Sequence, residues 1–173
     1  MALKPDRSIV GNQTDISFFY NSTAEKGEVL VFSTGGSGAA MDDATAVVTR
    51  PSTNPSGEIF AGVLLNDVVN KDLTQTHINF HKDEMQQGGK VTLARAPAVL
   101  VTDMVASGES PTIGQKLSFR LINKSHADRT NRGVFTTTAV SDTGTAYAPE
   151  SYQIGEALSV KDADGYFKVR LLK

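Results

Sequence analysis

The feature that most constrains this chain is the rhythm of its apolar segments. They are short, rich in β-branched and aromatic residues, and interrupted about every ten residues by Gly, Pro, Asn, Asp or Ser. Runs of this kind are typical of β-sandwiches and β-barrels, and helical periodicity is nearly absent. We therefore predict an all-β protein built on a single β-barrel or β-sandwich domain. The predicted strands are 28–33, 45–50, 58–65, 76–82, 90–95, 98–105, 115–122, 133–140, 152–160 and 165–172.

Several runs alternate between apolar and polar residues, as a strand with one wet face does. Phe167, Val169 and Leu171, for example, alternate with charged residues. The runs at 29–32 and 63–65 are instead apolar on both faces. They suit either central strands covered on both sides or a surface covered by another chain.

Two segments depart from this rhythm. Residues 1–27 are mostly polar and turn-prone, so we interpret them as an extended N-terminal arm on a β-rich body that spans 28–173. Residues 123–151 are polar with one short strand, and they are longer than a compact domain needs for a connection. We interpret this second segment as a polar loop or hairpin excursion from the body.

One apolar cluster lies within the arm, at Ile16, Phe18, Phe19 and Tyr20. Aromatic side chains that enter pockets dominate the energies of many interfaces, so these four residues are candidates for binding a partner. The equally favoured alternative is that the cluster folds back as a first strand on the protein's own sheet.

Composition limits the chemistry available to the chain. Its 173 residues fit one domain, and 17 basic against 19 acidic residues give a net charge of −2, which disfavours a nucleic-acid partner. The absence of cysteine removes disulfides, thiolate nucleophiles and cysteine-based zinc sites. No apolar run approaches the roughly 20 residues of a membrane helix, and the N-terminal stretch lacks a signal-peptide pattern. We expect a soluble, unexported protein with no membrane partner.

Three motifs contain residue types that can take part in binding or catalysis. The glycine-rich stretch 35–40 lacks the third glycine and the following helix of a dinucleotide-binding turn, so a flexible hairpin loop is favoured. His77, Asn79 and His81 share one face of a predicted strand, which suits a solvated face better than a metal site. His126 lies in the polar excursion with no nucleophile motif to serve. We therefore predict no catalytic residue, no metal and no cofactor, and no enzymatic activity.

The acidic pair Asp162 and Asp164, followed by Gly165, resembles part of a calcium loop. An EF-hand alignment, however, places Val160 and Leu171 at positions where calcium requires carboxylates. Asp-Gly between two β runs is a strong hairpin signal. We predict a tight type I′ turn that joins two closing strands.

Three parts of the chain carry a family resemblance. The N-terminal "LKPDRSIVGNQTDISFFYNSTAEKGEVLVFST", the middle "DLTQTHINFHKDEMQQGGKVTL" with "AVLVTDMV", and the closing "IGEALSVKDADGYFKVRLL" together are similar to the capsid decoration, or cement, proteins of tailed bacteriophages, particularly phages of cyanobacteria and related marine hosts. The resemblance rests on the order of β runs and glycine turns. It covers most of the chain except the excursion at 123–151.

The resemblance implies a structural virion protein on the capsid exterior, made in the host cytoplasm. Its partners would be the major capsid protein, whose neighbouring subunits it cements, and further copies of itself in a homo-oligomer, a trimer or a dimer. A tail, baseplate or fibre component is an alternative with the same β composition. A carbohydrate- or ligand-binding β module is another, although the chain has no tryptophan for stacking on sugar rings.

Overall fold

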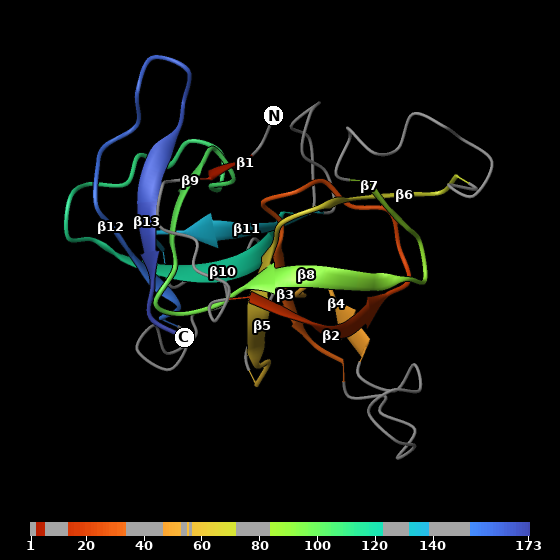
Figure 1. Ribbon diagram of the computed structural model, residues 1–173. Helices are drawn as coiled ribbons and strands as arrows, with labels where there is room; N and C mark the ends of the chain where they lie inside the picture. Colours follow the sequence, from red (N-terminus) through yellow and green to blue (C-terminus); the bar gives the residue numbers. More distant parts are fainter. Residues whose placement is uncertain are drawn as a thin grey trace.

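The computed structural model describes residues 3–5, 14–33, 47–52, 55, 57–71, 84–122, 132–138 and 153–173, and every regular element in these ranges is a β-strand (Figure 1). The prediction of an all-β chain with a β-barrel is confirmed. None of these residues belongs to a helix long and apolar enough to cross a membrane. The strands are β1 (Leu3–Pro5), β2 (Thr14–Tyr20), β3 (Val29–Phe32), β4 (Val47–Thr49), β5 (Phe60–Leu64), β6 (Asp67–Val69), β7 (Glu84–Gln86), β8 (Lys90–Ala94), β9 (Val99–Thr102), β10 (Lys116–Ile122), β11 (Arg132–Thr136), β12 (Gly155–Ala157) and β13 (Phe167–Leu171).

Five strands close into a barrel in the order β2-β4-β3-β5-β8, on the right in Figure 1. β2 runs parallel to β4, and the other neighbouring pairs are antiparallel. Strand alternation turns every second side chain inward, so that Leu30 enters the barrel while Val29 and Val31 face outward. The buried residues of the barrel core are Phe18, Tyr20, Leu30, Val48, Ala61, Leu64, Val68, Val91 and Leu93.

The remaining long strands form a six-stranded sheet in the order β1-β9-β13-β12-β10-β11, on the left in Figure 1. Its apolar face packs on the outside of the barrel at β3 and β5, and the two layers share one continuous core. The rings of Phe60 and Phe119, one from each layer, lie 6.2 Å apart. The runs predicted to be apolar on both faces are therefore covered on both sides by the chain itself.

The N-terminal segment belongs largely to this body. β2 closes the barrel by pairing with both β4 and β8, and β1 pairs with β9 at one edge of the sheet. The interpretation of residues 1–27 as an arm is thus corrected for 14–27, because Phe18 and Tyr20 alternate into the barrel core. The structure matches the alternative, in which the aromatic cluster forms a first strand of the protein's own sheet.

Three short strands, β1, β6 and β7, have no counterpart in the predicted set. β6 and β7 pair in parallel, and Val68 of β6 also bridges to Ala24. The predicted strand at 76–82 lies outside the described residues. Of the excursion at 123–151, the structure describes 132–138, where the predicted strand is confirmed as β11, paired with β10.

The closing hairpin is confirmed, but its turn differs from the prediction. β12 and β13 pair antiparallel, and the N–H of Gly165 donates to the carbonyl of Asp162 while the N–H of Asp162 donates to the carbonyl of Tyr166. This is a type I turn followed by a left-handed glycine, with φ +86° at Gly165. The Asp162 carboxylate accepts the N–H of Asp164 at 3.0 Å, a bond that favours this turn over type I′.

The junction between barrel and sheet depends on a glycine. β11 crosses β3 so closely that a Cβ on Gly133 would overlap the carbonyl oxygen of Val29 and lie 2.9 Å from Cδ of Pro51. The backbone of Gly133 is not left-handed, so glycine is required here only because there is no space for a side chain. A larger residue here would push the sheet away from the barrel.

We predict that Gly133→Ala lowers the free energy of unfolding by about 3 kcal/mol, since overpacking a rigid contact is costly. Gly165→Ala is the matched control, because its Cβ would meet nothing within 4 Å and only the left-handed φ opposes it. We expect that control to lose about 1 kcal/mol. Urea denaturation followed by circular dichroism measures both, and equal losses would contradict a steric role for Gly133.

Candidate functional site

The aromatic segment predicted to bind a partner lies in the barrel wall. Tyr20 is 2% exposed and Phe18 is also buried, with its ring edge-on to Phe32 at 5.2 Å. Phe19 is only half-buried, and the side chain of Ile16 lies outside the described residues. Phe18 and Tyr20 thus stabilise the barrel in this structure. Partner binding by the four residues stays a prediction.

A polar cavity of about 520 Å³ lies where the loop before β3, the end of β4 and the start of β11 meet. Four carboxylates and two guanidinium groups line it, so its wall carries charges of both signs. Sequence reasoning missed this site, because its residues are dispersed along the chain and match no motif. The charged lining residues are Glu25, Glu28, Arg50, Asp67, Glu84 and Arg132.

Glu28 is the centre of this charge cluster. Its side chain is 0% exposed, and it accepts two bonds from Arg50, at 2.7 Å to Nε and 3.1 Å to Nη2. Arg132 Nε lies 4.0 Å from the same carboxylate, and another nitrogen of Arg132 pairs with Glu25. The cluster therefore ties the barrel, through Glu25, Glu28 and Arg50, to the sheet, through Arg132. A buried charge held by two partners in this way is expensive to disrupt.

The same cluster perturbs two of its ionisable groups. Burial lowers the pKa of Arg50, but the hydrogen bond and charge of Glu28 outweigh it, and the net pKa is raised above its ordinary value. Burial raises the pKa of Tyr20 from 10.0 to about 12, with Arg50 opposing this shift and Glu28 adding to it. Arg50 thus stays cationic, and Tyr20 stays neutral, throughout the physiological range.

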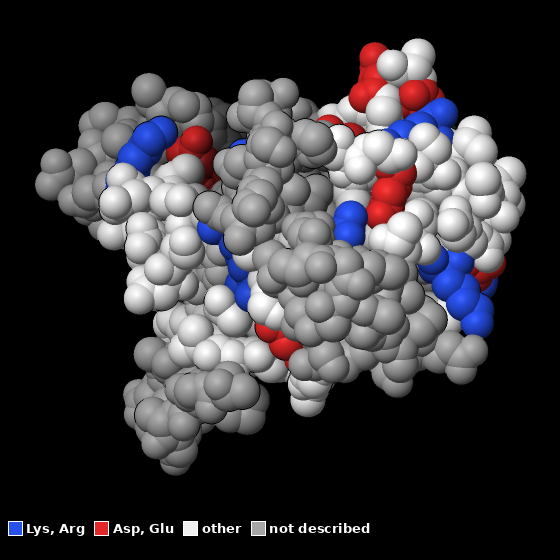
Figure 2. All heavy atoms as spheres, turned by 180° about the vertical axis from the view of Figure 1, so that it is seen from behind, with Lys and Arg blue, Asp and Glu red and all other residues white. Residues whose placement is uncertain are grey.

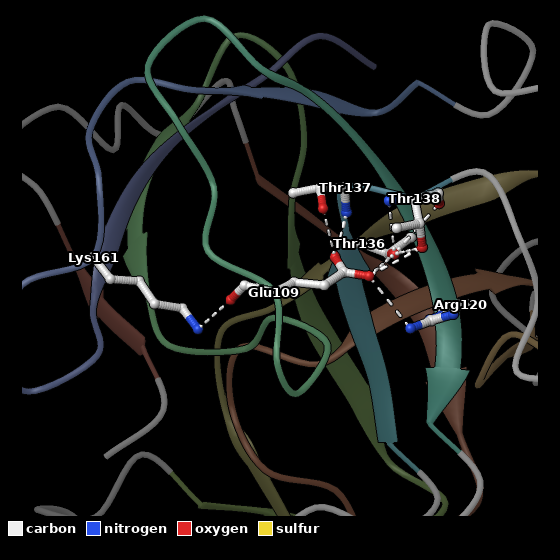
Figure 3. A network of polar contacts seen from close by, with 6 residues as sticks. All are labelled: Glu109, Arg120, Thr136, Thr137, Thr138 and Lys161. Carbon is white, nitrogen blue, oxygen red and sulfur yellow. Dashed lines mark hydrogen bonds and ion pairs between the residues drawn. The ribbon is translucent and has the colours of Figure 1, made fainter.

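A second polar network lies at the C-terminal end of β11 (Figure 3). The Glu109 carboxylate accepts bonds from the hydroxyls of Thr136, Thr137 and Thr138 at 2.8, 2.9 and 3.0 Å and from the N–H of Thr137 at 2.5 Å. Arg120 Nη2 pairs with it at 3.3 Å. This carboxylate is saturated with donors, so it acts as a structural clasp between the 103–115 loop and the end of β11.

A smaller cavity of about 380 Å³ opens beside β3 and β4, with a mainly apolar lining that includes Phe32 and Ile59. Glu58 lies on its wall, where burial raises the pKa of this carboxyl, and bonds from Ser52 oppose the shift. An apolar cavity of this size accepts a small side chain or ligand fragment.

Most of the candidate sequence motifs lie outside the described residues, namely 35–40, His77, Asn79, His81 and His126. Within the part of the chain that the structure describes, no three His, Cys, Asp or Glu side chains cluster as metal ligands. On the face drawn in Figure 2, Lys and Arg side chains alternate with Asp and Glu and form no continuous basic area among the described residues.

No protein-family model, no curated protein and no solved structure matches this chain.

We predict that Glu28→Gln lowers the free energy of unfolding by about 3 kcal/mol, because it leaves the partly buried charge of Arg50 without its counter-ion and a buried amide in the place of the carboxylate. The matched control is Glu156→Gln, which breaks the exposed pair with Arg170. That pair is expected to contribute less than about 1 kcal/mol. Chemical denaturation measures the free energy of unfolding of both variants. If Glu28→Gln loses no more of it than Glu156→Gln does, the cluster does not join the two layers.

Tyr20 gives a prediction for alkaline pH. Its folded-state pKa of about 12 exceeds the ordinary value of 10.0, so the unfolded chain releases the proton first and stability falls as the pH rises from 10 towards 12. Through this group the free energy of unfolding of the wild-type protein should fall by up to roughly 3 kcal/mol. The Tyr20→Phe variant has no phenol to ionise at this position, so it should not show this fall. Unfolding curves of both proteins between pH 9 and about 11.5 measure the difference. Parallel curves would refute the assignment.

Proposed function

We propose that this chain is a structural virion protein that binds the outer surface of a tailed-phage capsid and cements neighbouring major capsid protein subunits, acting as a homo-oligomer and not as an enzyme. The site of action is the capsid exterior, after synthesis in the host cytoplasm.

The observation that carries this proposal is where the resembling stretches fall in the fold. Residues 3–34, 72–93, 98–105 and 154–172 supply strands to both layers: β2, β3 and β8 to the barrel, and β1, β9, β12 and β13 to the sheet. The resemblance therefore includes strands of both layers, and it leaves out β11, which lies in the excursion at 123–151 but belongs to the packed sheet. A similarity confined to one hairpin would carry much less weight.

The mechanics of the body also favour a cementing role. Barrel and sheet share one core and are tied further by the Glu28 cluster, so a load applied to one layer is transmitted to the other. A protein that binds only the assembled shell stabilises it by mass action. Symmetric copies multiply modest contacts of about 1,200–2,000 Å² into firm attachment.

A ligand-binding β module is the second candidate, and the polar cavity of about 520 Å³ is the observation in its favour. Its described lining, however, contains no aromatic ring for stacking on a sugar, and Glu25, Glu28 and Asp67 already accept bonds from the chain. The cavity is better explained as the margin of a structural charge cluster.

The test is co-sedimentation with particles of the phage whose genome encodes the chain. We expect the purified protein to saturate expanded heads that lack it and to raise their melting temperature, but not to bind purified tails. Binding to tails alone would favour the tail, baseplate or fibre alternative, and binding to neither would refute a virion role.

A further inference from the structure

Two loops at one end of the sheet lie side by side. The first precedes β10 and includes a tight turn at 112–115, and the second is the 158–166 connection of the closing hairpin. Gly114 N–H donates to the carbonyl of Ala157 at 2.8 Å, and Lys161 Nζ donates to the carbonyl of Glu109 at 2.6 Å. We name this region, residues 107–115 with 158–166, the loop end.

The turn at 112–115 is held rigidly although it lies at the surface. Gln115 N–H donates to the carbonyl of Thr112, and the Gln115 side chain accepts the N–H of Thr112, both at 3.0 Å. Gly114 has φ +79°, as the third position of a type II turn requires. Ile113, at the second position, is therefore presented on a fixed backbone.

The loop end concentrates exposed apolar side chains. Ile113 is 73% exposed and Val160 is 56% exposed, and they are two of only four large hydrophobic residues exposed within the described ranges. A single surface hydrophobic residue needs no explanation. Here two lie on loops that are bonded to each other, and β-branched side chains on a rigid backbone lose little conformational entropy when they are buried by a partner.

The Glu109 clasp provides the rigidity (Figure 3). Its carboxylate is anchored on Thr136, Thr137 and Thr138, and its backbone carbonyl holds Lys161 of the second loop. One residue thus fixes both loops to the sheet.

We propose that the loop end is the surface by which this protein docks on its partner, with Ile113 and Val160 entering an apolar socket on the capsid shell. The inference rests on the proposed function and names the contact surface for it. It assigns docking to these residues instead of to Phe18 and Tyr20, which are buried in the barrel.

Charge indicates the chemistry around that socket. Asp162 and Asp164 are exposed at the tip of the hairpin, and neither has an ion-pair partner among the described residues. Lys161, the nearest cation in sequence, donates to the neutral backbone carbonyl of Glu109 and offsets one of the two negative charges. The loop end therefore presents exposed apolar side chains together with two carboxylates against one ammonium group, a net negative charge that fits a protein surface whose apolar socket is flanked by Lys or Arg.

The experiment measures binding of the full-length protein to purified phage heads for the wild type and for the double variant Ile113→Ser with Val160→Ser. We expect the double variant to bind at least tenfold more weakly, since anchor residues at interface centres contribute most of the affinity. Leu172→Ser is the matched control: Leu172 is 44% exposed but follows β13 at the end opposite the hairpin turn. We expect it to bind within about twofold of the wild type, as an exposed residue outside the contact should.

Asp164→Asn tests the charged margin, because the Asp164 side chain makes none of the hydrogen bonds that hold the turn. We expect weaker binding than the wild type at low salt and a shallower dependence on ionic strength. Thermal melting of every variant within a few degrees of the wild type shows that the fold is retained.

The outcomes separate the two proposals. If the wild type binds heads and the double variant binds equally well, the loop end is not the docking surface and the cementing function stands. If the wild type binds neither heads nor tails, both proposals fall. If the double variant loses its oligomeric mass in light scattering but still binds heads, the surface joins copies of this chain and the capsid-docking inference is overturned.

Discussion

The structure depends on one contact, the packing of the six-stranded sheet against the outside of the barrel at β3 and β5. Val29, Val31 and Val63 face away from the barrel interior, and without the sheet they would expose an apolar surface to water. Gly133 permits the approach because no Cβ stands between β11 and the carbonyl of Val29. The barrel and the sheet are consequently one body, and the charge cluster around Glu28 forms at the margin of their contact.

Strand rhythm predicted the fold class because alternation and turn residues are local properties. The nine predicted strands that fall on described residues all correspond to observed ones, and Asp162 to Gly165 was recognised as a turn. The turn type was wrong, since the choice between two-residue and three-residue loops depends on whether the Asp162 carboxylate caps the turn. β6 and β7 were missed because three-residue strands carry no periodicity of their own and form only where Val68 meets Ala24 and β7.

The sites were less predictable than the strands. An apolar alternation such as that of Phe18 and Tyr20 is the same whether the segment closes its own barrel or lies on a partner, so sequence alone left both alternatives open. The buried cluster was invisible for another reason: Glu28 and Arg50 are separated by 22 residues, and Arg132 and Glu25 by 107. Pairings over such distances follow from topology, which single-sequence patterns do not encode.

The buried and the exposed groups of this protein have different roles, and the difference is relevant to function. The carboxylates of Glu28 and Glu109 are bonded within the chain, so they fix the positions of the segments around them. The groups that remain exposed on the surface are of a different kind: apolar side chains such as Ile113, and hairpin carboxylates such as Asp164, on backbones that the bonded groups hold in place. A molecule that uses its polar chemistry to fix the shape of its surface is suited to binding another surface, and for that task rigidity reduces the entropy lost on association.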